Sequence, residues 1–189
     1  MIIEGLVTTL DAEGALNCAP MGPIVDRDFT RLTLRPFQSS HTYRNLKVHP
    51  YGVFHITDDV LLIAQAALHL LPEEPSSAPA ECIRGRVLEN CCRWYEFRVL
   101  RLDDAQERTV IDAEVIHAGR RRDFLGFNRA KHAVLEAAIL ATRLHLLPPA
   151  EVRAALQRLQ GLVEKTGGAT EQAAWNLICE YIAHWQPPP

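Results

Sequence analysis

The chain has 189 residues, of which 48% are hydrophobic and 23% charged, and its formal net charge is −3. These values are typical of a soluble globular protein with one substantial core, and they argue against a general nucleic-acid or membrane-surface binder. No basic segment followed by an apolar one opens the sequence, and the longest apolar run, residues 60–71, is too short to span a bilayer. We therefore expect a cytoplasmic protein with no membrane or nucleic-acid partner.

Cysteine and histidine spacing indicates no metal site. The five cysteines are an odd number without a C-x-x-C pair, and the eight histidines include no H-E-x-x-H pattern. Cys91 and Cys92 are neighbours on a predicted strand, so we expect their side chains to point to opposite faces. Reduced, structural cysteines are the expected state.

The first segments of the chain alternate apolar and polar residues between short turns. This pattern predicts strands over residues 2–10, 16–25 and 30–35. Pro20 and Pro23 cannot donate to a ladder, so the second half of the second strand is expected to form an edge or to leave the sheet. Successive hairpins of this kind predict an antiparallel, closed or partly closed β-barrel.

Residues 35–47 interrupt the strands with a short helix, which is expected to end near His49 because Pro50 disfavours helical geometry before it. The unpaired N–H groups of a helix N-terminus favour an anion, and Arg35 adds positive charge. The donors gathered there are Ser39, Ser40, His41 and Thr42. An ordinary helix cap with a solvated basic rim is the alternative.

The middle of the chain continues the strand pattern with one helix. The expected elements are a strand over 51–57, a helix over 60–70 capped by Asp58 or Asp59, a flexible loop over 71–80, and strands within 81–103 and over 108–117.

From Asn128 onward the periodicity is helical. The first helix, 128–146, is apolar around most of its circumference and should be buried by other helices, the barrel or a partner subunit. A second helix starts at Pro149, and Thr170 is expected to cap a third. The sequence thus predicts an α+β fold with a mainly β core, in which residues 1–126 form the barrel and residues 127–189 form a helical subdomain packed on it.

Two motifs carry a resemblance to a known superfamily. The segment Asn17-Cys-Ala-Pro-Met-Gly22, followed by a strand ending in arginine and then by Ser-Ser-His-Thr-Tyr-Arg-Asn-Leu, resembles the FMN-binding split-barrel proteins of the flavin-reductase-like kind. More narrowly, residues 41–47 together with 127–132 look like a domain-of-unknown-function family inside that superfamily. The resemblance implies an antiparallel split barrel with FMN as cofactor.

The resemblance also implies site residues. In that superfamily an N-x-A-P segment runs along the isoalloxazine ring and a T-x-x-N segment at a helix start holds the phosphate. The ring segment here comprises Asn17, Cys18, Ala19, Pro20, Met21 and Gly22. The phosphate segment comprises Thr42 and Asn45, with further contacts expected from Arg35, Ser39, Ser40 and His41.

Arg129 and Lys131 stand in the first turn of a predicted helix, where cations oppose the helix dipole. Their placement indicates an anionic partner, and we expect either residue, from the same or the partner subunit, to face the negative charge of reduced flavin. A solvated first turn is the alternative.

The implied function is an FMN-dependent oxidoreductase that passes a hydride from a nicotinamide or other donor through FMN to an unknown acceptor, as a homodimer with FMN near the interface. No catalytic residue is assigned, because hydride transfer to flavin N5 needs no protein acid or base. The alternatives are a non-catalytic flavin-binding protein for storage, delivery or sensing, and a binder of another phosphorylated or pterin-like ligand.

Overall fold

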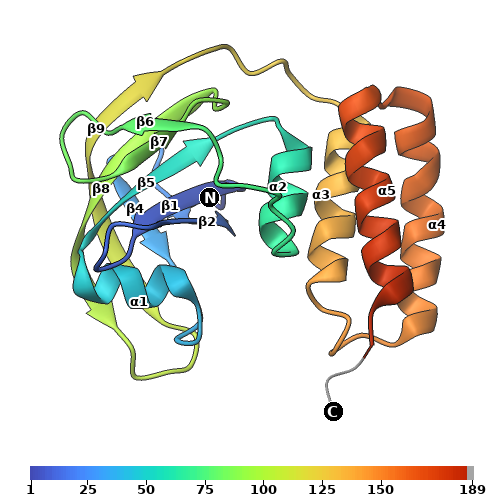
Figure 1. Cartoon of the computed structure of the whole chain (residues 1–189), viewed down its shortest axis with the longest axis horizontal. Helices are drawn as coiled ribbons and strands as arrows, with labels where there is room; N and C mark the ends of the chain where they lie inside the picture. Colours follow the sequence, from blue (N-terminus) through green and yellow to red (C-terminus); the bar gives the residue numbers. More distant parts are fainter. Residues whose placement is uncertain (187–189) are drawn as a thin grey trace. The chain divides into compact units, whose positions relative to one another are not determined.

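The computed structural model describes residues 1–186, and Figure 1 shows its elements in chain order. The chain divides into two compact units. The first comprises Met1–Thr57 and Glu73–Phe124, and the second comprises Asp58–Pro72 with the residues from Leu125 onward. Residues 58–72, which the sequence analysis placed with the barrel, thus pack with the C-terminal helices.

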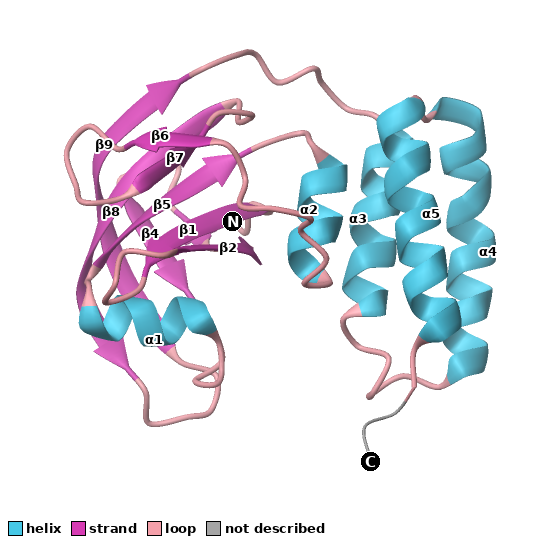
Figure 2. Cartoon of the chain, in the orientation of Figure 1, coloured by secondary structure: helices cyan, strands magenta, loops and turns pink. Residues whose placement is uncertain are grey.

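The first unit is built on a seven-stranded antiparallel sheet with the spatial order β2-β1-β5-β8-β9-β4-β3 (Figure 2). Its strands are β1 (Gly5–Leu10), β2 (Leu16–Met21), β3 (Ile24–Val25), β4 (Arg31–Leu34), β5 (Tyr51–Ile56), β8 (Arg93–Asp103) and β9 (Val110–Arg120). The residues before β1 reach the opposite edge of the sheet, because Ile2 pairs with Ile24 of β3. The sheet therefore curls into a barrel, and the predicted fold class is confirmed.

Apolar side chains fill the inside of this barrel. Leu32 and Leu34, which the alternation assigned to the core, are at most 1% exposed and pack with Phe54 and Phe97. Helix α1 (His41–Val48) lies between β4 and β5 in the sequence, and its Leu46 joins the same cluster. The predicted helix end is also confirmed, since His49 is the C-terminal cap.

Two local expectations in this unit were wrong. The predicted loop over 71–80 contains strand β6 (Ser77–Pro79), which pairs with β7 (Arg86–Leu88). Cys91 and Cys92 lie in the connection between β7 and β8, where both side chains are buried, and not on opposite faces of a strand. In each case pairing with distant residues, which local pattern does not encode, decides the structure.

The second unit consists of helices α2 (Val60–Ala67), α3 (Arg129–Ala141), α4 (Pro149–Thr166) and α5 (Ala169–His184). Helix α3 contacts the other three, and Figure 1 shows the four lying side by side. Small residues of α3, among them Ala130, Ala133 and Ala137, are at most 1% exposed, which explains its apolar circumference. The expectation that other helices bury it is confirmed. Within residues 1–186, no helix is both long and apolar enough to cross a membrane.

Helix caps in this unit agree only partly with the sequence analysis. Asp59 caps α2 by accepting the N–H of Leu62 at 3.1 Å. The cap of α5 is Gly168, whose N–H donates to Glu171 at 2.9 Å, so the expected cap at Thr170 was wrong. The carboxylate of Glu171, the third residue of α5, makes the capping hydrogen bond, and the hydroxyl of Thr170 does not.

Candidate ligand-binding site

The two motif segments meet at Thr9 of β1. The side-chain amide of Asn17 donates to Thr9 Oγ1 and to Thr42 Oγ1, both at 3.2 Å. The amide of Asn45 donates to Thr9 Oγ1 at 3.0 Å. The structure therefore joins strand β2 to helix α1 through one network of neutral polar side chains. The sequence analysis missed Thr9, because nothing in a single sequence distinguishes it from Thr8, the neighbouring threonine of β1.

Strand pairing places residues 17–21 along β1, and Gly22 follows directly after the strand. In the antiparallel register Asn17 lies opposite Thr9, and the pairing continues to Met21 opposite Gly5. Strand β2 forms one end of the seven-stranded sheet, as Pro20 within it and Pro23 shortly after it predict. Alternate backbone N–H and C=O groups on its outer side therefore face away from β1 and are available to a ligand.

The polar residues at the start of α1 differ in their exposure to solvent and in their hydrogen bonds. The hydroxyl of Ser40 accepts the N–H of Tyr43 at 3.2 Å and donates to the carbonyl of Phe37 at 2.7 Å, so Ser40 is the helix cap. Thr42 is only 1% exposed. The side chains of Ser39 and His41, in contrast, are exposed. Arg35 follows β4 and is partly buried.

A polar cluster fastens α1 to the turn between β8 and β9. Tyr43 donates to a carboxylate oxygen of Asp104 at 2.7 Å, and the Lys47 ammonium lies 2.8 Å from the same oxygen. The hydrogen bond with Asp104 raises the pKa of Lys47, and the same bond lowers the pKa of Asp104. The orientation of α1, and with it the position of Thr42, is therefore held from both sides.

Cys18 lies beside Asn17 on β2, opposite Thr8. Burial raises the pKa of its thiol to about 12, so the group stays protonated at neutral pH. Gly22 lies close to the side chains of Ile2 and Glu4, since a Cβ there would meet both at 2.9 Å. Both residues are thus adapted to close packing in this part of the barrel.

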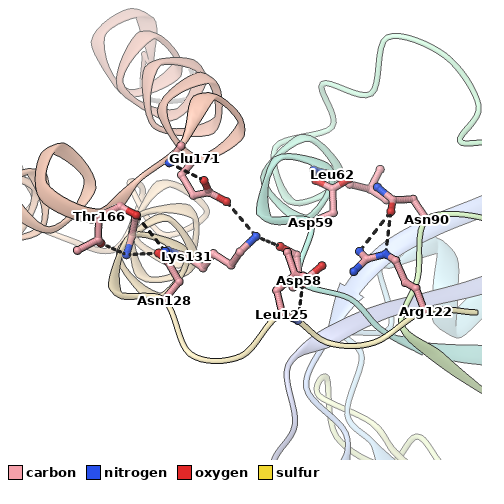
Figure 3. A network of polar contacts seen from close by, with 12 residues as sticks. Asp58, Asp59, Leu62, Asn90, Arg122, Leu125, Asn128, Lys131, Thr166 and Glu171 are labelled. Carbon is pink, nitrogen blue, oxygen red and sulfur yellow. Dashed lines mark hydrogen bonds and ion pairs between the residues drawn. The ribbon is translucent and has the colours of Figure 1, made fainter. Parts of the chain in front are cut away.

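Lys131, from α3, belongs to a network in the helical unit (Figure 3). Its ammonium lies 2.9 Å from a carboxylate oxygen of Glu171 and donates to the backbone carbonyl of Asp58 at 2.5 Å. The side chains of Lys131 and Glu171 are only 17% and 9% exposed. Arg129, two residues earlier, is exposed to solvent. The structure thus brings Asn17, Thr42 and Asn45 together and gives Lys131 an ion pair inside its own unit.

Ligands for a metal ion do not gather anywhere in the part of the chain that the structure describes: no group of three or more His, Cys, Asp or Glu side chains has suitable geometry.

The fold is that of the flavin-reductase-like split barrels. Among solved structures, 2-nitrobenzoate 2-nitroreductase from Pseudomonas fluorescens shares it at 16% identity, with a TM-score of 0.53 over 62% of this chain and 64% of its own. Flavoredoxin of Desulfovibrio vulgaris shares it at 13% identity, with a TM-score of 0.54 over 63% and 69%. An FMN-bound DUF447 protein from Methanosarcina mazei is 26% identical, with a TM-score of 0.80 over 95% and 94%.

Family models identify the chain more closely. The N-terminal domain of the protein of unknown function DUF447 matches residues 3–122, and the following DUF447 model matches residues 128–180. The chain therefore belongs to the DUF447 family. Comparison with curated proteins gave no match.

Proposed function

We propose that this chain binds FMN in its first unit, with the phosphate at the start of α1 and the ring along β2. The observation that carries the proposal is the network in which Asn17 and Asn45 both donate to Thr9, because it holds the two segments side by side. The FMN-bound family member from Methanosarcina mazei, similar over 95% of this chain, supports it.

At the phosphate end, the exposed groups are the ones suited to direct contact. Ser40 already caps the N–H of Tyr43, and the N–H of the exposed His41 remains for an anion. The exposed side chain of Ser39 adds a hydroxyl. No acidic residue occupies the first turn of α1, so nothing there repels a phosphate.

The buried side chains of Thr42 and Asn45 have a different role in this proposal. Thr42 and Asn45 are 1% and 7% exposed, so their side chains hold the helix in place while the surface groups contact the ligand. Along β2, the outward backbone groups of Ala19 to Gly22 are suited to the hydrogen-bonding edge of the flavin ring. Arg129 remains a candidate for the negative charge of the reduced ring.

We further propose that the protein is an FMN-dependent oxidoreductase that passes a hydride from a nicotinamide or another donor to an acceptor yet to be identified. The cofactor supplies the redox chemistry, and the protein binds and orients it and excludes water. The protonated thiol of Cys18 fits this division, since it adds no charge beside β2. The nitroreductase with the same fold supports this class of reaction by analogy only.

A flavin titration followed by anaerobic addition of NADH or NADPH tests both steps. Uptake of FMN with its visible absorption, followed by bleaching, is the expected result. A protein that takes up no FMN contradicts the flavin site, and a thermal-shift panel of pterins and other phosphorylated compounds then tests the remaining ligand classes. FMN uptake without bleaching by either nucleotide supports the non-catalytic storage, delivery or sensing function instead.

We also propose a homodimer with FMN near the interface. Phe37, two residues before Ser39, is 48% exposed, and Leu100 and Ile116 on β8 and β9 are 49% and 41% exposed. Apolar side chains exposed on the surface of the first unit, with Phe37 near the proposed phosphate end, favour burial against a second copy. Light scattering on the purified protein is expected to give twice the monomer mass, and Phe37→Ser is expected to shift it toward monomer.

A further inference from the structure

A cavity lies within the helical unit. Its volume is about 530 Å³, which falls within the range of about 300–1,000 Å³ that is usual for small-molecule sites. It is formed by the connection between α3 and α4, the first turns of α4 and the last turns of α5. None of the residues proposed to contact FMN lines it.

The cavity wall is almost wholly apolar. Leu144 and Leu147 come from the connection, Leu156 from α4, Ile182 from α5, and Trp185 from the end of α5. Such a wall favours a hydrocarbon or aromatic body, because the main gain on binding is the removal of apolar surface from water.

One cation interrupts this wall. Arg153 lines the cavity, and within residues 1–186 its guanidinium has no hydrogen-bond or ion-pair partner. Pro149 and Val152, from the start of α4, line the cavity beside it, and the N-cap residue of that helix, Pro148, makes no side-chain cap. The positive end of the helix dipole and the guanidinium therefore act on the same region.

The electrostatics of this region favour an anion. Glu151, in the same turn of α4, does not line the cavity, so Arg153 is the only charged side chain among the lining residues. A planar guanidinium matches a carboxylate in a two-point hydrogen bond.

We propose that this cavity binds an apolar carboxylic acid, with the carboxylate on Arg153 and the hydrocarbon body among the leucines. The site is separate from the proposed flavin site and does not depend on flavin binding. Filling it is expected to stabilise the helical unit by mass action, since the ligand binds only the folded form.

Calorimetric titration of the full chain with decanoate and with decanol tests the proposal. The two probes share a ten-carbon chain and differ in charge, so decanoate is expected to bind saturably and about tenfold more tightly than decanol. Arg153→Gln is expected to remove this difference by weakening decanoate alone. Leu156→Trp, which fills the cavity, is expected to abolish binding of both.

Arg158→Gln is the matched control, because Arg158 lies on the same helix and does not line the cavity. It is expected to leave both affinities unchanged. Equal binding of the two probes to the natural chain, equal effects of the two arginine variants, or no saturable binding overturns the proposal. So does a change of molecular mass in Leu156→Trp without an effect on decanoate, which would make the cavity an interface between copies.

Discussion

Asn45 of helix α1 donates its side-chain amide to Thr9 of strand β1 across 3.0 Å, although 36 positions separate them in the chain. Both residues are buried, at 7% and 2% exposure. Thr9 Oγ1 also accepts from Asn17 on β2, and Asn17 donates directly to Thr42 of α1 as well. Thr9 is therefore the oxygen that the two amides share between the proposed ring strand and the proposed phosphate helix.

Replacing Thr9 with valine should therefore weaken the contact between β2 and α1. Valine keeps the shape of threonine and removes the acceptor, which takes from the buried amide of Asn45 its acceptor and leaves Asn17 with Thr42 alone. We expect the free energy of unfolding to fall by about 1–3 kcal/mol. We also expect the dissociation constant for FMN to rise about tenfold, which equals about 1.4 kcal/mol. Urea denaturation and FMN titration measure the two effects.

Thr9→Ser is the control for this experiment. Serine retains the oxygen and loses only a methyl group, so FMN affinity should return close to that of the natural chain. A folded Thr9→Val protein that binds FMN normally would show that the network has no part in ligand binding.

Ser39 and Ser40 should respond in opposite ways to replacement by alanine. Ser40 caps α1, so Ser40→Ala should lower the free energy of unfolding by about 1 kcal/mol. Ser39 is exposed, so Ser39→Ala should leave stability unchanged and weaken FMN binding about fivefold through loss of a phosphate contact. Thermal unfolding and FMN titration of both variants check this. Normal FMN affinity in Ser39→Ala would place the phosphate elsewhere.

The local sequence pattern was sufficient to predict much of the barrel. Alternation placed Leu32 and Leu34 in the core, and Pro20 with Pro23 indicated an edge strand, because both signals are properties of a few adjacent residues. The end of the helix over residues 41–48 could also be predicted from the sequence, since Pro50 disfavours helical geometry before it.

Contacts between residues far apart in the chain could not be predicted from the sequence. Thr9 enters the site only because the register sets it opposite Asn17 and beneath α1. Likewise α2 has an apolar sequence that fits either unit, and its packing against α3 and α5 decides the matter. The partner of Lys131 is 40 positions away by number, at Glu171, so the pair became visible only in the fold.

Lys131 should prove to be a stabilising residue of the helical unit. Burial pushes the pKa of Glu171 upward, but the hydrogen bonds from Lys131 and from the N–H of Gly168, together with the charge of Lys131, outweigh it and leave that pKa below its ordinary value of 4.5. The pair therefore stabilises the fold above that pH, and this contribution is lost as the pH falls through the lowered pKa. Lys131→Met should cost on the order of 3 kcal/mol at neutral pH and much less in acid. Denaturation at several pH values measures the difference.

Arg129→Gln provides the comparison. Arg129 is exposed, so this change should leave the free energy of unfolding unaltered at every pH. If Arg129 faces the flavin, its loss should weaken binding of the reduced cofactor more than binding of the oxidised one. A Lys131→Met protein of natural stability that has lost FMN would instead assign the flavin contact to Lys131.

His55 of β5 should govern acid stability of the first unit. Its ring lies 3.3 Å from the carbonyl of Leu6 and accepts the N–H of Leu88 at 3.1 Å, with no exposed surface. Burial lowers its pKa from 6.5 to about 3, so the unfolded chain takes up a proton at pH values where the folded chain does not. The stability that neutral His55 contributes is thus complete above pH 6.5 and falls as the pH drops from 6.5 toward 3.

The slope of this loss is one proton, or about 1.4 kcal/mol per pH unit. His55→Gln should remove that slope while lowering stability at neutral pH by about 1–3 kcal/mol, since glutamine cannot make both hydrogen bonds of the ring. The exposed His145 offers a control, and His145→Gln should retain the full pH dependence. Urea denaturation of the three proteins across this range provides the measurement. Parallel curves for the natural chain and His55→Gln would mean that His55 is protonated in the folded state, with Leu88 N–H left to another acceptor.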